Sequence, residues 1–216
     1  MHPLSRSSPP PVTTAPRSYA ADSMSFEMRH RALRLLERCS SCDAGLCELC
    51  VPATLRRLVA AFAAHATRLA AGRSESADAP AALLASSAVR AIAACVKRGA
   101  AERAVLLDNG GIEAVASALR SQLAHGSRSG NELLMANASS VIVACAKPHE
   151  LRIVARIAEC GVVDLLVDVV KHCEFESVKK NGCVALAKLA GDVKCSAQIR
   201  AGDGMRMLMD LGRKYC

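Results

Sequence analysis

Residues 137–147 read Asn-Ala-Ser-Ser-Val-Ile-Val-Ala-Cys-Ala-Lys, and this stretch decides the fold because a related pattern occurs twice more. The related stretches are 87–97, Ser-Ala-Val-Arg-Ala-Ile-Ala-Ala-Cys-Val-Lys, and 181–191, Asn-Gly-Cys-Val-Ala-Leu-Ala-Lys-Leu-Ala-Gly. The first residues of successive stretches, 87, 137 and 181, are 50 and 44 residues apart. In each stretch the fourth, fifth and eighth positions after the start are apolar, which predicts a helix with one buried face.

A second shared feature follows each stretch: a short helical segment, a glycine and then a longer amphipathic segment. The short segments are 100–108, 149–159 and 193–200, and the corner glycines are Gly110 or Gly111, Gly161 and Gly202. Glycine allows the positive φ that ends one helix and turns the chain sharply into the next. We therefore expect each unit to consist of a long helix, a short helix, a glycine corner and another long helix.

A weaker copy lies upstream, where the helical segment 24–38 is followed by a cysteine-rich stretch and by a helix that starts near Pro52. We expect four repeat units over 24–71, 81–124, 131–172 and 175–214, within a helical domain over 24–216. The segments 72–80 and 125–131 are polar and are predicted to be linkers.

The first 23 residues differ in composition from the rest of the chain. Residues 1–23 are rich in Ser, Pro, Thr and Arg, which predicts a disordered tail. The five prolines among them do not suit the amphipathic helix of an organelle transit peptide, so we do not expect one.

The composition of the whole chain favours a helical protein. Only 2% of its residues are aromatic, with no Trp, so the core must be built from Ala, Leu, Val, Ile and Cys. This argues against β-sandwiches, which favour aromatic and β-branched residues, and against nucleic-acid platforms that stack bases on aromatic rings. Eleven cysteines, mostly in apolar helical runs and with no signal peptide before them, favour free thiols in a reducing compartment. We expect a cytoplasmic protein, with no membrane partner because no apolar run reaches spanning length.

These stretches resemble the armadillo repeat family, whose units contain two or three helices and recur every 40–47 residues or so. Residues 109–115, Asn-Gly-Gly-Ile-Glu-Ala-Val, resemble its "Gly-Gly-Ile-x-x-Leu-Val" second helix, and residues 136–146 resemble its "Asn-Ala-x-x-x-Leu-x-Asn-Leu-Ala" third helix. Residues 50–58 resemble its "Gly-x-Ile-Pro-x-Leu-Val-x-Leu". The resemblance covers 24–214, with HEAT repeats as the nearest alternative. It implies an all-α fold, a right-handed α-solenoid of armadillo-type helical repeats.

The resemblance also implies a function, because the family binds extended peptides or helices of other proteins along its third helices. Importin-alpha-like members clamp a basic peptide with Trp and Asn, but this chain has no Trp, and Ala94, Ala144 and Lys188 stand at the positions that match the Asn. β-catenin-like members use basic residues to meet acidic partners, and Lys97 and Lys147 match those positions. We therefore expect a non-enzymatic scaffold or adaptor that binds acidic or extended protein segments through Lys97, Lys147 and Lys188. The alternative is that these lysines complement the dipoles of the helices that they end.

Four cysteines form the most distinctive cluster of the chain. Cys39, Cys42, Cys47 and Cys50 have the spacing C-x2-C-x4-C-x2-C, which could hold one tetrahedral Zn²⁺ through four thiolates. The alternative is packing, because this chain uses cysteine freely as a small core residue, or else a disulfide or redox pair. Zinc is the one cofactor that the sequence suggests.

Two further functions remain as alternatives. The cysteine cluster and the basic residues Arg56, Arg57, Arg68 and Arg73 would together suit an RNA-associated module, although the scarcity of aromatic side chains weighs against nucleic acid. A structural subunit of a cytoskeletal or ciliary assembly is the other alternative, on family analogy alone.

The last helix carries a surface that no following unit would cover. We predict self-association or partner docking there, through Met205, Leu208 and Met209.

The sequence contains no constellation that would support catalysis. It has no phosphate-binding loop, no G-x-S-x-G and no H-E-x-x-H motif. The histidines are scattered and are expected on the surface or at helix ends, and Asp164 and Asp168 are expected on a solvated helix face. We therefore do not expect an enzyme.

Overall fold

A computed structural model describes residues 31–32, 34–70, 79–124 and 132–215. Within these ranges the chain is all-helical and contains no strand, which confirms the predicted all-α class. Residues 34–40 are helical, whereas the predicted tail over 1–23, the start of the first expected helix at residue 24 and most of both predicted linkers lie outside the described residues. The linker predicted over 72–80 is two residues too long, because Ala79 and Pro80 already belong to a helix.

Every third helix is short, as expected from units that consist of a long, a short and another long helix. Their bounds are α2 Asp43–Cys50, α3 Pro52–Ala70, α4 Ala79–Arg98, α5 Ala100–Asp108, α6 Gly111–Ala124, α7 Glu132–Cys145, α8 Leu151–Glu159, α9 Val162–His172, α10 Glu176–Leu189, α11 Val193–Ala201 and α12 Gly204–Tyr215.

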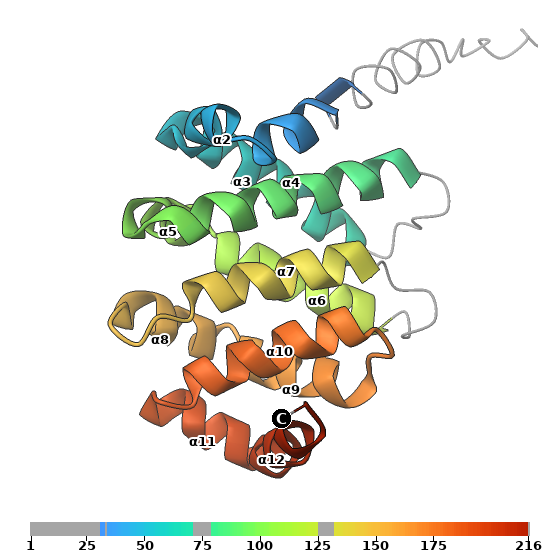
Figure 1. The fold of residues 1–216 in the computed structure, drawn as a ribbon, viewed down its shortest axis with the longest axis vertical. Coiled ribbons are helices and arrows are strands. Elements are labelled where there is room, and N and C mark those ends of the chain that lie inside the picture. Colours follow the sequence, from blue (N-terminus) through green and yellow to red (C-terminus); the bar gives the residue numbers. More distant parts are fainter. Residues whose placement is uncertain (1–30, 33, 71–78, 125–131, 216) are drawn as a thin grey trace, which may run out of the picture.

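Helices three apart along the chain pack on one another and form three columns. One column contains α4, α7 and α10, a second contains α3, α6 and α9, and a third contains α5, α8 and α11. Figure 1 shows α4, α7 and α10 side by side in nearly the same direction, with the short helices gathered at one end of them. Each helix of the first column therefore packs its side against the next helix, and the outward surfaces of α4, α7 and α10 together form one face.

Hydrogen bonds between units occur at corresponding positions. The Asn137 side-chain amide on α7 donates to the Ser86 carbonyl oxygen on α4 at 3.2 Å, and that of Asn181 on α10 donates to the Ala136 carbonyl on α7 at 3.0 Å. The two donors are 44 residues apart and the two acceptors are 50 apart, which are the spacings that align the sequence. Both bonds tie neighbouring helices of one column in the same register.

Small and aliphatic side chains fill the core. Ala91, Ala118, Ala138 and Ala185 are fully buried, and Phe62 is the sole aromatic residue among the large, fully buried side chains of the described chain. Alanine at these positions lets helix backbones approach closely, so the scarcity of aromatic residues follows from how the helices pack.

Buried thiols belong to this core as well. Cys95, Cys145 and Cys195 have no exposed surface. Burial raises the pKa of Cys145 and of Cys195 to about 12, so both are neutral thiols and act as small apolar side chains.

Two of the three predicted glycine corners adopt the left-handed backbone that the sequence pattern implies. Gly110 has a φ of 70° before α6 and Gly161 has a φ of 67° before α9. The third prediction is wrong, because Gly202 has a φ of −88° and the next residue, Asp203, takes the left-handed conformation with a φ of 60°. Asp tolerates this region better than most residues with a side chain. Glycine at position 202 instead lets the backbone pass close to α9, since a Cβ there would lie 3.2 Å from Val167 Cγ1.

Candidate functional site

The three lysines predicted from the sequence lie at one end of the α4–α7–α10 column. Lys97 is in the last turn of α4, Lys188 is in the last turn of α10, and Lys147 follows the end of α7 at Cys145. Lys97 is exposed and the other two are half-buried. Because these helices pack in the order α4, α7, α10, the structure brings the three ammonium groups to the same end of the shared face.

Lys188 has the most defined environment of the three. Its Nζ donates a hydrogen bond to the Val143 carbonyl oxygen on α7 at 3.0 Å. Burial lowers the pKa of Lys188, and the positive charges of Lys147 and Lys97 lower it further. The lysines are therefore close enough to repel one another, which is a cost that a bound anion would relieve.

No described carboxylate forms an ion pair with Lys97, Lys147 or Lys188. This differs from the short-helix column, where cations pair with carboxylates of the preceding unit. There Arg152 on α8 binds Asp108 on α5 at 3.4 Å, and Arg156 on α8 binds Glu113 on α6. Such ion pairs join the units, whereas the positive charges of the three lysines at the end of the α4–α7–α10 column are not neutralised by any described carboxylate.

Sequence reasoning missed the most buried ion pair of the described chain. Arg103 Nε on α5 donates to Glu150 Oε2 at 2.7 Å, and Arg103 Nη1 donates to the Val96 carbonyl oxygen at 2.9 Å. The Arg103 side chain is 8% exposed and that of Glu150 is 12% exposed. An Arg among apolar residues of a short helix was the one available signal, but its partner lies 47 residues further along the chain.

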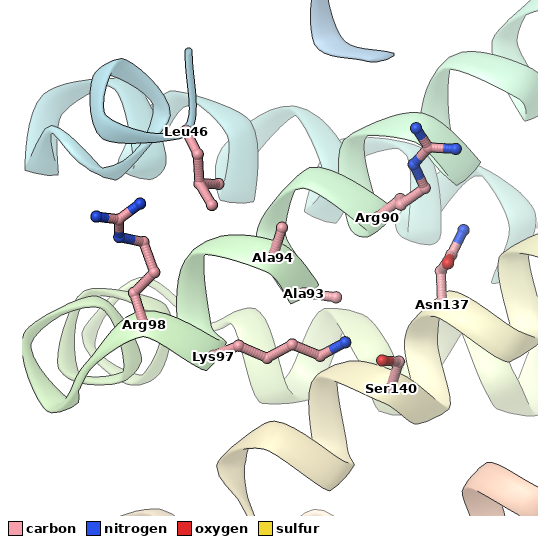
Figure 2. Close-up of a pocket in the computed structure, with 8 residues that line it drawn as sticks. All are labelled: Leu46, Arg90, Ala93, Ala94, Lys97, Arg98, Asn137 and Ser140. Carbon is pink, nitrogen blue, oxygen red and sulfur yellow. The ribbon is translucent and has the colours of Figure 1, made fainter. Parts of the chain in front are cut away.

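A hollow lies beside the lysine end of the face, between α2, α4 and α7 (Figure 2). Its lining residues are Leu46 from α2, Arg90, Ala93, Ala94, Lys97 and Arg98 from α4, and Asn137 and Ser140 from α7. In Figure 2, Lys97 extends toward Ser140 and the Asn137 amide points toward Arg90. Three cations thus surround a floor of alanine methyl groups, and no carboxylate lines the hollow.

The four clustered cysteines lie on α2 and just before it. Cys39 is in the helical segment 34–40, Cys42 precedes α2, Cys47 is within α2 and Cys50 is its last residue. Cys42 caps α2, since its Sγ accepts from the Gly45 amide at 3.4 Å, and both Cys42 and Cys47 are exposed. Cys39 and Cys50 are half-buried against the core. Among the described residues no three His, Cys, Asp or Glu side chains are grouped as metal ligands. Zinc binding at this cluster stays a prediction.

The predicted apolar surface on the last helix is only partly exposed. Met205 is 36% exposed and Met209 is 57% exposed, whereas Leu208 is half-buried and packs against the core. Any contact made by this surface would depend mainly on the two methionines.

Other predicted residues have the following surroundings. Arg56, Arg57 and Arg68 are exposed on α3, while Arg73 lies outside the described residues. Asp164 and Asp168 are exposed on α9 as expected. The expectation that every histidine is at the surface or a helix end is wrong for His65, which is 7% exposed in the interior of α3.

The comparisons with known proteins return no relative. No family model, no curated protein and no solved structure matches this chain. None of the described helices combines the length and the apolar character needed to cross a bilayer.

Proposed function

We propose that the chain is a non-enzymatic adaptor, an armadillo-type α-solenoid whose α4–α7–α10 face binds an acidic segment of another protein. The observation that carries this proposal is the position of Lys97, Lys147 and Lys188. They stand at one end of three stacked helices, the charges of Lys147 and Lys97 add to burial in lowering the pKa of Lys188, and no described carboxylate pairs with them. Charge complementarity of this kind accelerates association and selects the register of the partner.

The regular column supports an extended or helical partner. Neighbouring helices in a bundle lie about 8–10 Å apart, so three successive lysines offer cations at intervals along a line about 20 Å long. A partner with acidic residues on one edge would meet them in turn. The arrangement as a right-handed solenoid belongs to this proposal and rests on the three helix columns and on the repeated Asn bonds.

Charge reversal at all three positions tests the proposal. The variant Lys97→Glu, Lys147→Glu, Lys188→Glu is expected to lose its partners in affinity capture followed by mass spectrometry. The matched control is Arg120→Glu, Lys194→Glu, Arg200→Glu, which changes the net charge equally at exposed positions on α6 and α11. Far-UV circular dichroism and thermal melting of both variants check that they fold.

The expected result is that proteins with acidic segments are retained by the control and lost by the lysine variant. Binding should also weaken as salt rises, because exposed charges are screened over about 10 Å at 0.1 M ionic strength. Capture of the same proteins by the lysine variant and the wild type would contradict the proposal.

A further inference from the structure

The hollow between α2, α4 and α7 contains three cations that no described residue neutralises. Arg90, Lys97 and Arg98 are exposed, and none of them has an ion pair or a hydrogen bond with a described residue. By contrast, Arg103 and Arg156 use their guanidinium groups on carboxylates of neighbouring units. The cations of the hollow are therefore free to hold a ligand.

Arg90 and Lys97 line the hollow from one helix. They are seven residues apart on α4, which places them on one face about two turns apart. Figure 2 shows Lys97 reaching toward Ser140, while the Arg90 guanidinium lies further along the hollow, across from the Asn137 amide. Ser140 adds a hydroxyl that makes no hydrogen bond with a described residue. These groups supply N–H and O–H donors from two helices to the lining of one hollow.

The charge of the hollow favours a dianion over a single carboxylate. Three cations line it and no acidic side chain does. One carboxylate would neutralise a single charge, whereas a phosphoryl group carries about −1.5 to −2 at neutral pH and offers three acceptor oxygens. The guanidinium fork of Arg also matches phosphate geometry in two parallel hydrogen bonds.

The uncharged part of the lining favours a peptide as the carrier of the phosphoryl group. Leu46 forms an apolar wall, and Ala93 and Ala94 form the floor (Figure 2). These side chains can contact the methylene of a phosphorylated residue and an apolar neighbour. No lining residue is aromatic, so the hollow has no surface on which an unpaired base would stack.

We propose that this hollow binds a phosphorylated serine or threonine side chain of a protein partner, with Arg90, Lys97 and Ser140 around the phosphoryl group. Arg98 lies on the Leu46 side of the hollow and meets acidic residues that flank the phosphorylated position. The inference rests on the proposed function and refines it, because it makes capture at this end of the face dependent on phosphorylation of the partner.

The test uses the full chain and a short peptide with blocked ends, composed of Gly and Ser with one leucine on each side of a central residue. Three versions of the peptide carry Ser, phosphoserine or Glu at the centre, and isothermal titration calorimetry measures each dissociation constant. The phosphoserine peptide is expected to bind at least about tenfold more tightly than the Ser peptide, since hydrogen bonds to charged groups supply this much. The Glu peptide is expected to bind more weakly than the phosphoserine peptide.

Variants identify the site. Arg90→Gln and Ser140→Ala are each expected to reduce the gap between the phosphoserine and Ser peptides several-fold. The matched control Arg200→Gln, exposed on α11, should leave the gap unchanged. Equal binding of the phosphoserine and Glu peptides, or a gap that survives Arg90→Gln, would overturn the inference.

The remaining outcomes separate this inference from the proposed function. If the peptides show no gap but capture of acidic proteins still depends on Lys147 and Lys188, the phosphoryl site is wrong and the adaptor function stands. If the phosphopeptide does not bind while a single-stranded oligouridylate binds in an Arg90-dependent way, the hollow is a nucleic-acid contact and the inference is also wrong.

Discussion

Substitution of Gly161 measures how much a glycine with a left-handed backbone conformation contributes to the free energy of unfolding. Its φ is 67°, and a Cβ built on it would meet no atom within 4 Å. Gly161→Ala is therefore expected to lower the free energy of unfolding by about 1 kcal/mol through backbone strain alone. Urea denaturation measures the difference. Gly191→Ala is the control, because that site is equally open and has no positive φ, so it should be neutral or slightly stabilising.

The ion pair of Arg103 and Glu150 makes stability depend on pH. The Arg103 guanidinium donates hydrogen bonds to Glu150 and holds the pKa of that carboxyl below its ordinary value of 4.5. A carboxyl with a lowered pKa in the folded state stabilises the fold above its unfolded pKa, and this contribution is lost as the pH falls through the folded pKa.

Glu150→Gln tests this dependence, because Gln has nearly the shape of the protonated carboxyl. The variant is expected to lower the free energy of unfolding by about 2 kcal/mol at pH 7. The gap to the wild type should close in urea denaturation as the pH drops below 4.5. A gap that stays constant from pH 7 to strongly acidic conditions would mean that the ion pair contributes nothing.

At the scale of helices, the repeated Asn bonds hold the α4–α7–α10 column in register. Asn137→Ala and Asn181→Ala each remove an amide that reaches the preceding helix, and each is expected to lower the free energy of unfolding by about 1 kcal/mol. Asn109→Ala is the control, because that amide donates to Val105 within its own segment at an exposed position. Losses for the first two variants no greater than for Asn109→Ala would show that the bonds do not couple the helices.

The helices could be predicted from the sequence because their signals are local. Apolar spacing marked the buried faces of α4, α7 and α10, and the predicted short segment over 100–108 coincides with α5. The glycine corners were predictable where glycine is needed for its φ, at Gly110 and Gly161.

The errors concern contacts that the local pattern does not record. Asp203 takes the left-handed conformation between Gly202 and Gly204. A Cβ on either glycine would lie too close to Val167, and this contact with α9 is not recorded in the local sequence. Arg90 was not predicted as a ligand-binding residue, because its surroundings also depend on contacts between units. It faces the hollow only because α2 and α7 flank α4 there, and this neighbourhood depends on packing between units.

At the scale of the whole molecule, the end formed by α12 is predicted to associate with a second copy. Met209 is 57% exposed there and Met205 is 36% exposed. Sedimentation equilibrium of the wild type is expected to show self-association at high concentration, and Met209→Glu should abolish it because a buried charge without a partner is costly. Leu151→Glu, at a 69% exposed position on α8, is the control. A monomeric wild type at all concentrations would contradict the prediction.

The columns also have a mechanical consequence. In the α4–α7–α10 column each helix is bonded to the next unit, through pairs such as Asn181 with Ala136 and Lys188 with Val143, both 45 residues apart. Force applied to the two ends of such a stack loads the units in series, so the outermost unit can peel away while the others stay folded. Each rupture would release roughly 150 Å of extended chain. The molecule would therefore unfold under tension one unit at a time. A partner bound across α4, α7 and α10 would connect the units and raise the force needed to unfold each of them.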